Sequence, residues 1–213
     1  MMKESLLTLT SAALVALSGC SEPVTDTGSN GTRQTESDSE TLVAPVADAQ
    51  NVDAGLAVGD QAPLNVALLT KEGETTLENI LETGPAVIVF TRSVEWCPYC
   101  QSQLKSINAI AGDLKERGFD LYGLSYDGPD EQSRFAKNQS LQYGMLSDQP
   151  SAAIDAFGLR DPQYTEGRAV GVPYASVFVV DKEGNILARS VSGDYKKRPT
   201  NAQILALVDS TRS

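Results

Sequence analysis

The chain has 213 residues, of which 41% are hydrophobic and 21% are charged, so it is long enough for one folded domain with a sizeable core. Its formal net charge is −11, and no stripe of Lys and Arg is visible. Nucleic acids are bound through clustered cationic side chains, so this composition argues against a nucleic-acid partner. The short basic cluster Lys196-Lys197-Arg198 is expected to lie in a solvated turn.

Residues 1–19 have the layout of a secretory signal peptide. Lys3 supplies a positive charge near the start, and the apolar stretch at residues 6–17 is too short to span a membrane comfortably. Residues 17–20, Leu-Ser-Gly-Cys, resemble the lipobox of bacterial lipoproteins. The resemblance implies cleavage before Cys20 and attachment of lipid to its sulfur and its new amino group. An ordinary signal peptide with an incidental cysteine is the alternative.

A lipid anchor would hold the protein in the cell envelope, on the periplasmic side. Each buried CH₂ group adds about 0.8 kcal/mol of membrane affinity, so several acyl chains anchor a protein firmly. The residue after the cysteine is Ser21 rather than an Asp. By analogy with the sorting rule of lipoproteins, this favours the outer membrane over the inner one.

Residues 20–57 differ in composition from the rest of the chain. The segment is rich in Ser, Thr, Gly, Ala and acidic residues, and it carries a net charge of −6. Such a segment cannot bury enough apolar surface to offset the entropy lost on ordering. We therefore predict a disordered acidic tether at residues 20–57 and a folded domain at residues 58–213.

The first part of the folded domain leads up to a buried strand. The pattern predicts a strand at residues 65–69, a turn at 71–74 and a short helix at 77–81. Residues 86–90, Ala-Val-Ile-Val-Phe, are continuously apolar, which is typical of a strand buried on both faces.

A Cys-x-x-Cys motif follows this strand. Cys97 and Cys100 are separated by Pro98 and Tyr99, and residues 101–117 carry apolar side chains at helical spacing. A CxxC motif between a strand and a helix is typical of redox chemistry. If the motif opens the helix, unpaired N–H groups and the helix dipole stabilise a thiolate at Cys97, which we predict to be the nucleophile. Pro98 suits the first helical turn because its ring presets the backbone angle.

Two other side chains are predicted to neighbour this redox site. Trp96 comes directly before the first cysteine, and Arg92 lies five residues before it. The positive charge of Arg92 would lower the pKa of the Cys97 thiol, whereas the negative charge of Glu95 would raise it.

Metal binding and a structural disulfide are the alternatives for the motif. A zinc site needs about four ligands, but the chain has no His and only one cysteine besides the pair. We therefore expect no metal or other cofactor. A purely structural bridge would close so short a loop that it would stabilise the fold very little.

The remainder of the domain alternates between strands and helices and ends in a hairpin and a helix. Alternation of this kind predicts an α/β fold, with a mixed central sheet and helices on both faces. The predicted strands are 119–125, 143–146, 174–180 and 186–191, and the predicted helices are 129–139, 151–157 and 201–208.

Five short stretches, in this order along the chain, carry a resemblance to a known family. They are Val-Gly-Asp-Gln-Ala-Pro at 58–63, Val-Ile-Val-Phe at 87–90, Gly-Leu-Ser-Tyr-Asp-Gly-Pro at 123–129, Leu-Ser-Asp at 146–148, and Val-Phe-Val-Val-Asp-Lys-Glu-Gly at 177–184. Together they resemble the peroxiredoxin-like family of alkyl hydroperoxide reductases and thiol-specific antioxidants (redoxins). The resemblance implies a thioredoxin-like fold for the domain.

The resemblance also implies a second loop at the redox site. Gly171-Val172-Pro173 lies where thioredoxin-like proteins carry a cis-proline, in a loop that faces the CxxC motif and holds an extended substrate segment. Pro173 is therefore expected to be cis and to belong to the site, with Tyr174 close to the disulfide.

The chain departs from peroxiredoxins at the residues that handle peroxide. In that family a Pro-x-x-x-Thr-x-x-Cys motif orients and attacks the peroxide, and an Arg before the late strand polarises it. Counted back from Cys97, this chain has Val94 at the Thr position and Phe90 at the Pro position. The position of the Arg falls near Ala175, so the peroxidase machinery looks incomplete.

The sequence therefore favours a membrane-anchored thiol–disulfide oxidoreductase, an envelope reductant or antioxidant. Cys97 would attack a disulfide in a protein or small-thiol substrate, Cys100 would resolve the mixed disulfide, and a membrane electron donor would recharge the pair. This requires sulfurs that a partner can reach, facing residues 171–174.

Three other functions stay open. The first is a thiol peroxidase with Cys97 as the peroxidatic residue and Cys100 as the resolving residue. The second is a non-enzymatic envelope lipoprotein that uses a degenerate redoxin domain for binding. The third is a metallochaperone, which the absence of His disfavours.

Overall fold

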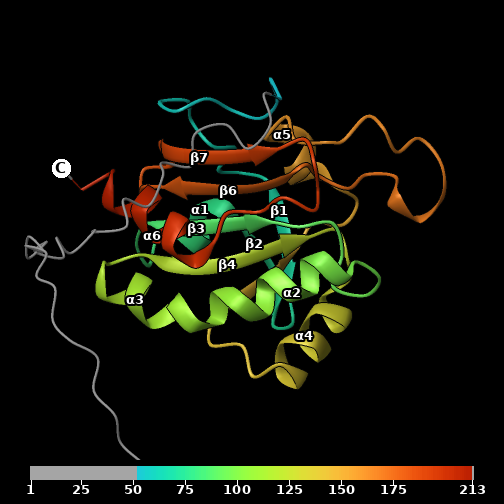
Figure 1. Ribbon diagram of the computed structural model, residues 1–213, viewed down its shortest axis with the longest axis horizontal. Helices are drawn as coiled ribbons and strands as arrows, with labels where there is room; N and C mark the ends of the chain where they lie inside the picture. Colours follow the sequence, from blue (N-terminus) through green and yellow to red (C-terminus); the bar gives the residue numbers. More distant parts are fainter. Residues whose placement is uncertain (1–51, 213) are drawn as a thin grey trace, which may run out of the picture. The chain divides into compact units, whose positions relative to one another are not determined.

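Seven strands form one mixed sheet in the order β2-β1-β5-β4-β3-β6-β7 (Figure 1). The computed structural model describes residues 52–212, so the predicted signal peptide, Cys20 and most of the predicted tether lie outside the described residues. The strands are β1 Ala67–Thr70, β2 Gly73–Thr76, β3 Ala86–Phe90, β4 Asp120–Ser125, β5 Gly144–Ser147, β6 Ala175–Val180 and β7 Ile186–Ser192.

Six α-helices connect or follow these strands in the described part of the chain. Strands β3, β4 and β5 run parallel to one another, and β6 pairs antiparallel with both β3 and β7. The helices are α1 Leu77–Leu81, α2 Pro98–Ile107, α3 Ala111–Glu116, α4 Pro129–Asn138, α5 Ala152–Ala156 and α6 Asn201–Asp209, with short 3₁₀ helices at Asn108–Ile110 and Gly167–Ala169. The predicted α/β class and thioredoxin-like fold are confirmed.

The sheet divides the hydrophobic core into two halves, because successive residues of a strand point to opposite faces. On one face, Ile88 and Phe90 of β3 pack with the side chains of α1 and α5. On the other, Val87 and Val89 pack with α2, α3 and α6. All five side chains of β3 are completely buried, as its continuous apolar run predicted. Helices therefore cover both faces of the sheet (Figure 1).

Two local predictions differ from the structure. The turn predicted at 71–74 is shorter in the structure, because residues 73 and 74 belong to the edge strand β2, whose polar sequence Gly-Glu-Thr-Thr gives no alternating apolar signal. The helix predicted at 101–117 is interrupted at residues 108–110, where the Asn108 side chain bonds to the backbone of Ser140 and Gln142. Gly118, at φ 87°, ends this helical stretch.

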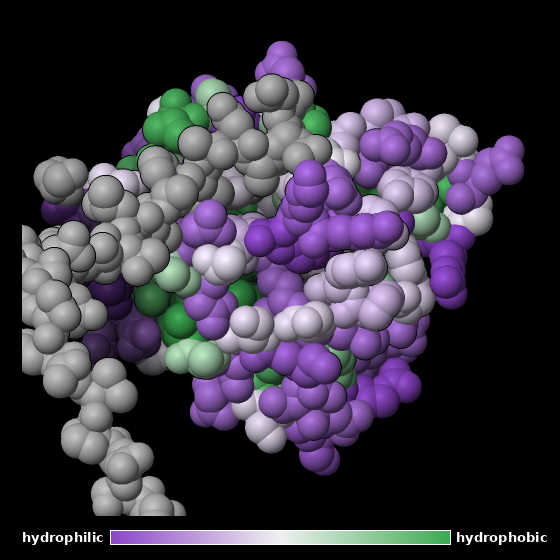
Figure 2. Space-filling view, viewed as in Figure 1, coloured by the Kyte–Doolittle hydropathy of each residue, from purple (hydrophilic) through white to green (hydrophobic). Residues whose placement is uncertain are grey.

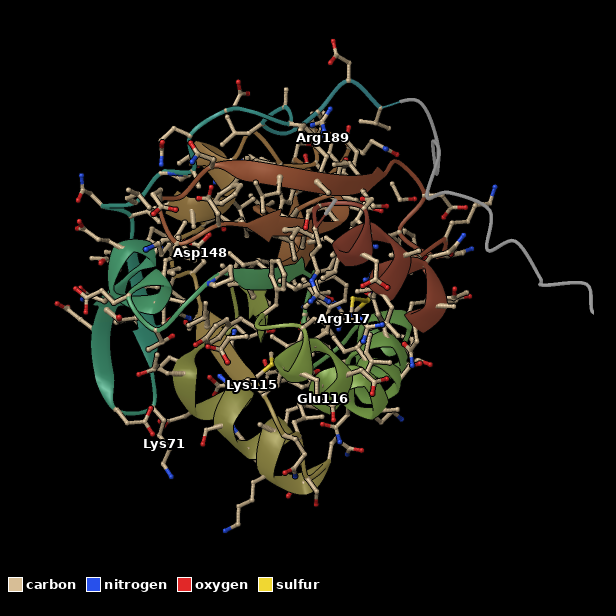
Figure 3. The ribbon with its side chains drawn as sticks, turned by 90° about the vertical axis from the view of Figure 1, so that its left-hand side faces the viewer. Lys71, Lys115, Glu116, Arg117, Asp148 and Arg189 are labelled. Atoms are coloured by element: carbon tan, nitrogen blue, oxygen red, sulfur yellow. A yellow bond between two sulfur atoms is a disulfide. The ribbon has the colours of Figure 1, made fainter. Side chains whose placement is uncertain are left out.

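Residues 54–56 are hydrogen-bonded to the folded domain. Backbone hydrogen bonds join Gly55 to Gly158 and Leu56 to Phe157. Arg189, from β7, donates from Nη1 to the carbonyls of residues 54, 55 and 56, each at 2.8 Å (Figure 3). Arg189 thus holds residues 54–56, which precede the predicted boundary, against β7. None of the described helices is long and apolar enough to cross a membrane.

We expect Arg189→Ala to release this segment from the domain. Hydrogen bonds to a charged group contribute about 1.5–3 kcal/mol, so the free energy of unfolding should fall by about 2 kcal/mol. Urea unfolding measures the loss, and limited proteolysis should cut near residues 54–56 faster. Lys182→Ala, in the exposed β6–β7 turn, is the control. Equal stability and proteolysis of the two variants would contradict the role given to Arg189.

Candidate active site

The two cysteines of the motif lie at the start of α2, joined as a disulfide with their Cα atoms 5.2 Å apart. Cys97 is the N-cap residue of the helix, Pro98 occupies its first turn, and the Cys100 N–H donates to Cys97 Sγ at 3.3 Å. Figure 3 shows the disulfide as a yellow bond inside the fold. The prediction that the motif opens a helix after a buried strand is confirmed, and so is the first-turn position of Pro98.

The loop that presents the cysteines is held by the buried carboxylate of Asp127, which follows β4. Its oxygens accept hydrogen bonds from Ser93 Oγ at 2.6 Å, from the Val94 N–H at 2.6 Å and from Ser125 Oγ at 2.7 Å. Ser93 Oγ in turn accepts from the N–H groups of Glu95 and Trp96. The parallel pairing of β3 with β4 brings these segments together, because both strands end at the same edge of the sheet.

Arg92 is buried at this edge, with 5% of its surface exposed. Its guanidinium carbon lies 5.1 Å from the centre of the Trp96 ring, 4.4 Å from that of Tyr164 and 4.2 Å from that of Tyr195. Its Nε has no hydrogen-bond partner. Aromatic faces attract a guanidinium through their quadrupole, so the three rings form a cage for the cation. Arg92 thus contacts Trp96, the residue directly before Cys97.

A second arginine reaches the disulfide from the segment after β7. Arg198 Nη2 lies 3.2 Å from Cys100 Sγ, Nη1 donates to Gln103 Oε1 at 2.5 Å, and Nε donates to the Tyr195 carbonyl at 2.9 Å. Burial, together with the positive charge of Arg92, lowers the pKa of Arg198 to about 10. The expectation that Arg198 lies in a solvated turn is therefore wrong, although its neighbours Lys196 and Lys197 are exposed.

Both sulfurs are covered, since Cys97 is 1% exposed and Cys100 is fully buried. The Tyr99 and Tyr195 rings meet edge to face, with centroids 5.7 Å apart. Trp96 Nε1 donates to the Tyr126 hydroxyl, which donates to the Arg168 carbonyl. The accessible sulfur required for exchange with a protein disulfide is absent from this conformation.

Pro173 and Tyr174 do not have the predicted roles. Among the described residues the cis peptide bond is Gln149–Pro150, so the Val172–Pro173 bond is trans. Pro173 pairs with Arg160, and the Tyr174 N–H donates to the Leu159 carbonyl. The described hydrogen bonds and ring contacts do not join either residue to the disulfide. The connection to α5, rather than the CxxC motif, fixes this loop.

A small hollow of about 270 Å³ lies beside the disulfide. Arg198, which donates to Gln103 and contacts Cys100 Sγ, forms part of its wall together with Gln103. Tyr99, 44% exposed, also lines it and is one of three large hydrophobic side chains exposed among residues 52–212. The face shown in Figure 2 is mostly hydrophilic. Tyr99 is thus an exposed aromatic side chain in the wall of this hollow.

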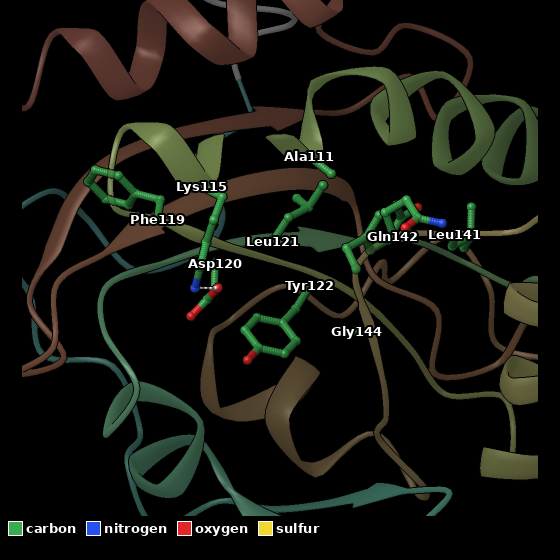
Figure 4. Close-up of a pocket in the computed structure, with 10 residues that line it drawn as sticks. Ala111, Lys115, Phe119, Asp120, Leu121, Tyr122, Leu141, Gln142 and Gly144 are labelled. Carbon is green, nitrogen blue, oxygen red and sulfur yellow. Dashed lines mark hydrogen bonds and ion pairs between the residues drawn. The ribbon is translucent and has the colours of Figure 1, made fainter. Parts of the chain in front are cut away.

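A larger hollow of about 510 Å³ lies far from the cysteines (Figure 4). Asp120 and Gly144, the first residues of β4 and β5, line it. It is thus at the amino ends of the parallel strands, whereas the cysteines follow the carboxyl end of β3. Its Lys115 is paired with Asp120 at 2.6 Å. In α/β sheets, ligands bind beyond the carboxyl ends of strands, so we assign no chemistry to this hollow.

The described residues contain no group of three or more His, Cys, Asp or Glu side chains that could hold a metal ion. The chemistry of the site therefore rests on the two sulfurs, the guanidinium groups of the buried Arg92 and the partly buried Arg198, and the start of α2.

The model of one protein family, described as the AhpC/TSA family, matches residues 58–189. The chain belongs to the AhpC/TSA family. It is 29% identical over 142 residues to the peroxiredoxin Bcp of Escherichia coli K12, covering 66% of this chain and 88% of that protein. It is 25% identical over 151 residues to a thiol peroxidase of Aquifex aeolicus, covering 70% of this chain and 85% of that one.

Solved structures agree with this membership. The peroxidoxin BcpB of Mycobacterium tuberculosis aligns with a TM-score of 0.62 at 21% identity, covering 74% of this chain and 97% of that chain. A peroxiredoxin-like protein of Aquifex aeolicus aligns with a TM-score of 0.61 at 25% identity, covering 74% and 88%. This AhpC/TSA-family protein is thus an oxidoreductase of the antioxidant type with a thiol-based role.

Sequence reasoning missed two residues of the site. Asp127 lies in one of the stretches that carried the family resemblance, but nothing in its spacing relates it to Ser93. Arg198 belongs to the basic cluster at residues 196–198, which the sequence predicts to be a surface turn. It lies 98 residues from its partner Cys100. The missing Arg before β6 could have indicated Arg198. A site that lacks this family cation would need a positive charge from another part of the chain.

We expect Asp127→Ala to destabilise the oxidised protein by about 3 kcal/mol or more, because two buried hydroxyls and one N–H lose their acceptor and each such loss costs about 1–3 kcal/mol. Urea unfolding of the disulfide form measures the loss. Glu116→Ala, at an exposed position of α3, is the control and should change little. A loss below about 1 kcal/mol would show that the loop does not depend on this carboxylate.

Proposed function

We propose that this protein is a thiol peroxidase in which Cys97 and Cys100 alternate between a dithiol and a disulfide. Membership of the AhpC/TSA family and the likeness to relatives named peroxiredoxin and thiol peroxidase support the proposal. The observation that carries it is the buried CxxC disulfide at the start of α2.

The size of the oxidant distinguishes a peroxidase from a protein-disulfide reductase. A protein disulfide has to bring its own sulfur into line with the attacking thiolate, which requires an exposed cysteine. Both cysteines are buried, and the Arg198 side chain lies against Cys100 Sγ. A peroxide of a few atoms needs a far smaller opening. We therefore propose reduction of peroxide, rather than disulfide exchange with a protein, as the function.

The reaction balances with the two cysteines alone and an external thiol reductant. A cysteine thiolate attacks one oxygen of the peroxide, the O–O bond breaks, and the departing alkoxide takes a proton and leaves as an alcohol. The attacking sulfur becomes a sulfenic acid. The other cysteine attacks that sulfur, closes the disulfide and releases water. Two thiols of the reductant then restore the dithiol and leave as a disulfide.

We expect the reduced protein to consume one equivalent of hydrogen peroxide or tert-butyl hydroperoxide and to lose two thiols. Trp96 is the only Trp in the chain and its ring lies beside Arg92, so its fluorescence should report the oxidation. The Cys97→Ser,Cys100→Ser double variant should neither consume peroxide nor change in fluorescence.

Reduction of insulin provides the contrasting measurement. The proposal expects rapid peroxide consumption and slow insulin reduction. Rapid insulin reduction with peroxide consumption no faster than that of free cysteine would overturn it in favour of a dithiol reductase.

The proposal also places the enzyme in the envelope, anchored by lipid on Cys20 and more specifically at the outer membrane. The lipobox-like sequence at residues 17–20 supports this. The acidic segment that follows would then serve as a spacer between membrane and domain. A membrane-linked electron donor is the matching source of reducing thiols.

Radiolabelled palmitate should be incorporated into the wild-type protein in a Gram-negative host, and Cys20→Ser should abolish the label. Cys97→Ser,Cys100→Ser should keep it, which separates lipidation from redox chemistry. Label that persists in Cys20→Ser, or that never appears in the wild type, would remove the anchor from the proposal.

A further inference from the structure

Two arginines near the redox motif have no carboxylate partner: the partly buried Arg198, which contacts Cys100 Sγ, and the buried Arg92, which contacts the ring of Trp96. The ion pairs of residues 52–212 include neither Arg92 nor Arg198. Arg198 instead contacts an amide oxygen, a backbone carbonyl and a sulfur. A buried charge is costly unless an opposite charge compensates it, so the site is built for an anion that the oxidised protein lacks. Reduction of the disulfide supplies such an anion as a thiolate.

The two sulfurs are not equally placed to become that thiolate. Cys97 Sγ accepts one hydrogen bond, from the neutral Cys100 N–H at 3.3 Å. Cys100 Sγ lies 3.2 Å from the guanidinium Nη2 of Arg198. Hydrogen bonds from a charged donor are roughly twice as strong as those between neutral groups. The helix dipole favours both sulfurs, because both lie in or next to the first turn of α2.

We propose that Arg198 stabilises the thiolate of Cys100, so that Cys100 attacks the peroxide and Cys97 resolves the resulting sulfenic acid. This inference rests on the proposed peroxidase function, and it reverses the roles that the order of the motif suggests. Arg198 touches the reacting sulfur, and its charge takes the place of the Arg that the sequence lacks before β6.

The hollow through which a peroxide would enter lies on the side of the disulfide where Arg198 contacts Cys100. Arg198 and Gln103 line the hollow of about 270 Å³, and Arg198 Nη2 lies directly against Cys100 Sγ. Neither cysteine itself lines the hollow, so one side chain separates the cavity from the sulfur. A small shift of Arg198 would let a peroxide reach Cys100, with the guanidinium next to the oxygen that departs.

The chemical step follows from this placement. Cys100 Sγ attacks the hydroxyl oxygen of the hydroperoxide, and the O–O bond breaks. The alkoxide leaves beside the Arg198 guanidinium and takes a proton from water, while Cys100 becomes the sulfenic acid. Cys97 then attacks Cys100 Sγ, the S–O bond breaks, and hydroxide leaves with the thiol proton as water.

The other charged groups near the pair are Arg92, Lys196, Glu95 and Asp127. The buried Asp127 carboxylate acts against a thiolate, but it already accepts three hydrogen bonds, two of them from the loop before Cys97. Arg92 adds a buried positive charge, and Lys196 lines the hollow. Tyr99 also lines the hollow, and its ring contacts that of Tyr195. Glu95, the carboxylate nearest in sequence, is exposed.

Single-cysteine variants of the full chain test the roles directly. In a Cys20→Ser background, reduced Cys97→Ser and Cys100→Ser are each mixed with one equivalent of hydrogen peroxide and then with dimedone. Mass spectrometry measures the sulfenic acid adduct with time. We expect Cys97→Ser to form the adduct at Cys100 at least tenfold faster than Cys100→Ser forms it at Cys97.

Equal or faster reaction at Cys97 would overturn the inference and leave the peroxidase function standing. Failure of the wild type and of both variants to react faster than free cysteine would overturn the proposed function, and the inference with it. The two failures are thus distinguishable.

Arg198 is tested through the ionisation of Cys100. In the Cys20→Ser,Cys97→Ser protein, thiolate absorbance near 240 nm and the rate of peroxide oxidation are followed against pH. Arg198→Met removes the charge that favours the thiolate, so both midpoints should move to higher pH, and the rate at neutral pH should fall about tenfold. Arg198→Lys should recover part of the shift.

Arg134→Met, which removes an exposed arginine of α4, is the matched control and should change neither midpoint. A merely structural role for Arg198 would lower the melting temperature without moving the pH midpoints. Midpoints of Arg198→Met that coincide with those of Arg134→Met would overturn the assignment.

Discussion

The contact of the partly buried Arg198 guanidinium with Cys100 Sγ is the interaction on which the site depends. Arg198 and Arg92 lie out of reach of every carboxylate that forms an ion pair in the described part of the chain. Removal of a guanidinium from water is costly, and burial accordingly lowers the pKa of Arg198. Aromatic rings, an amide and a carbonyl offset part of the cost. A thiolate offsets more, which couples the charge of the site to its redox state.

The fold makes this arrangement possible by bringing together segments that are far apart in the chain. Parallel pairing of β3 with β4 places Ser93 within hydrogen-bond distance of Asp127, and this fixes the loop before the cysteines. The antiparallel pair β6 and β7 then returns the chain, so that Arg198 arrives at Cys100 from beyond β7. The family scaffold thus keeps a cation at the sulfurs although the Arg expected before β6 is missing.

Burial also decides between the chemistries that a CxxC motif can perform. The same pair would suit disulfide exchange if its first sulfur were exposed, and the local sequence is compatible with either use. The burial of both sulfurs, with Arg198 against Cys100, favours a small oxidant instead. It also implies that the segment after β7 has to move when a reductant restores the dithiol, because a thiol must reach a sulfur that is now enclosed.

Local pattern by itself determined the elements that carry the chemistry. The apolar run at residues 86–90, the helix at 77–81 and the helix opened by Pro98 follow from periodicity, propensity and capping, which act over a few residues. The family resemblance supplied the fold. What only the tertiary structure decided is which distant groups meet: Asp127 with Ser93, Arg198 with Cys100, and Pro173 with Arg160 rather than with the disulfide. The physical reason is that these contacts come from strand pairing and packing across tens of residues, which leave no periodic trace in the sequence.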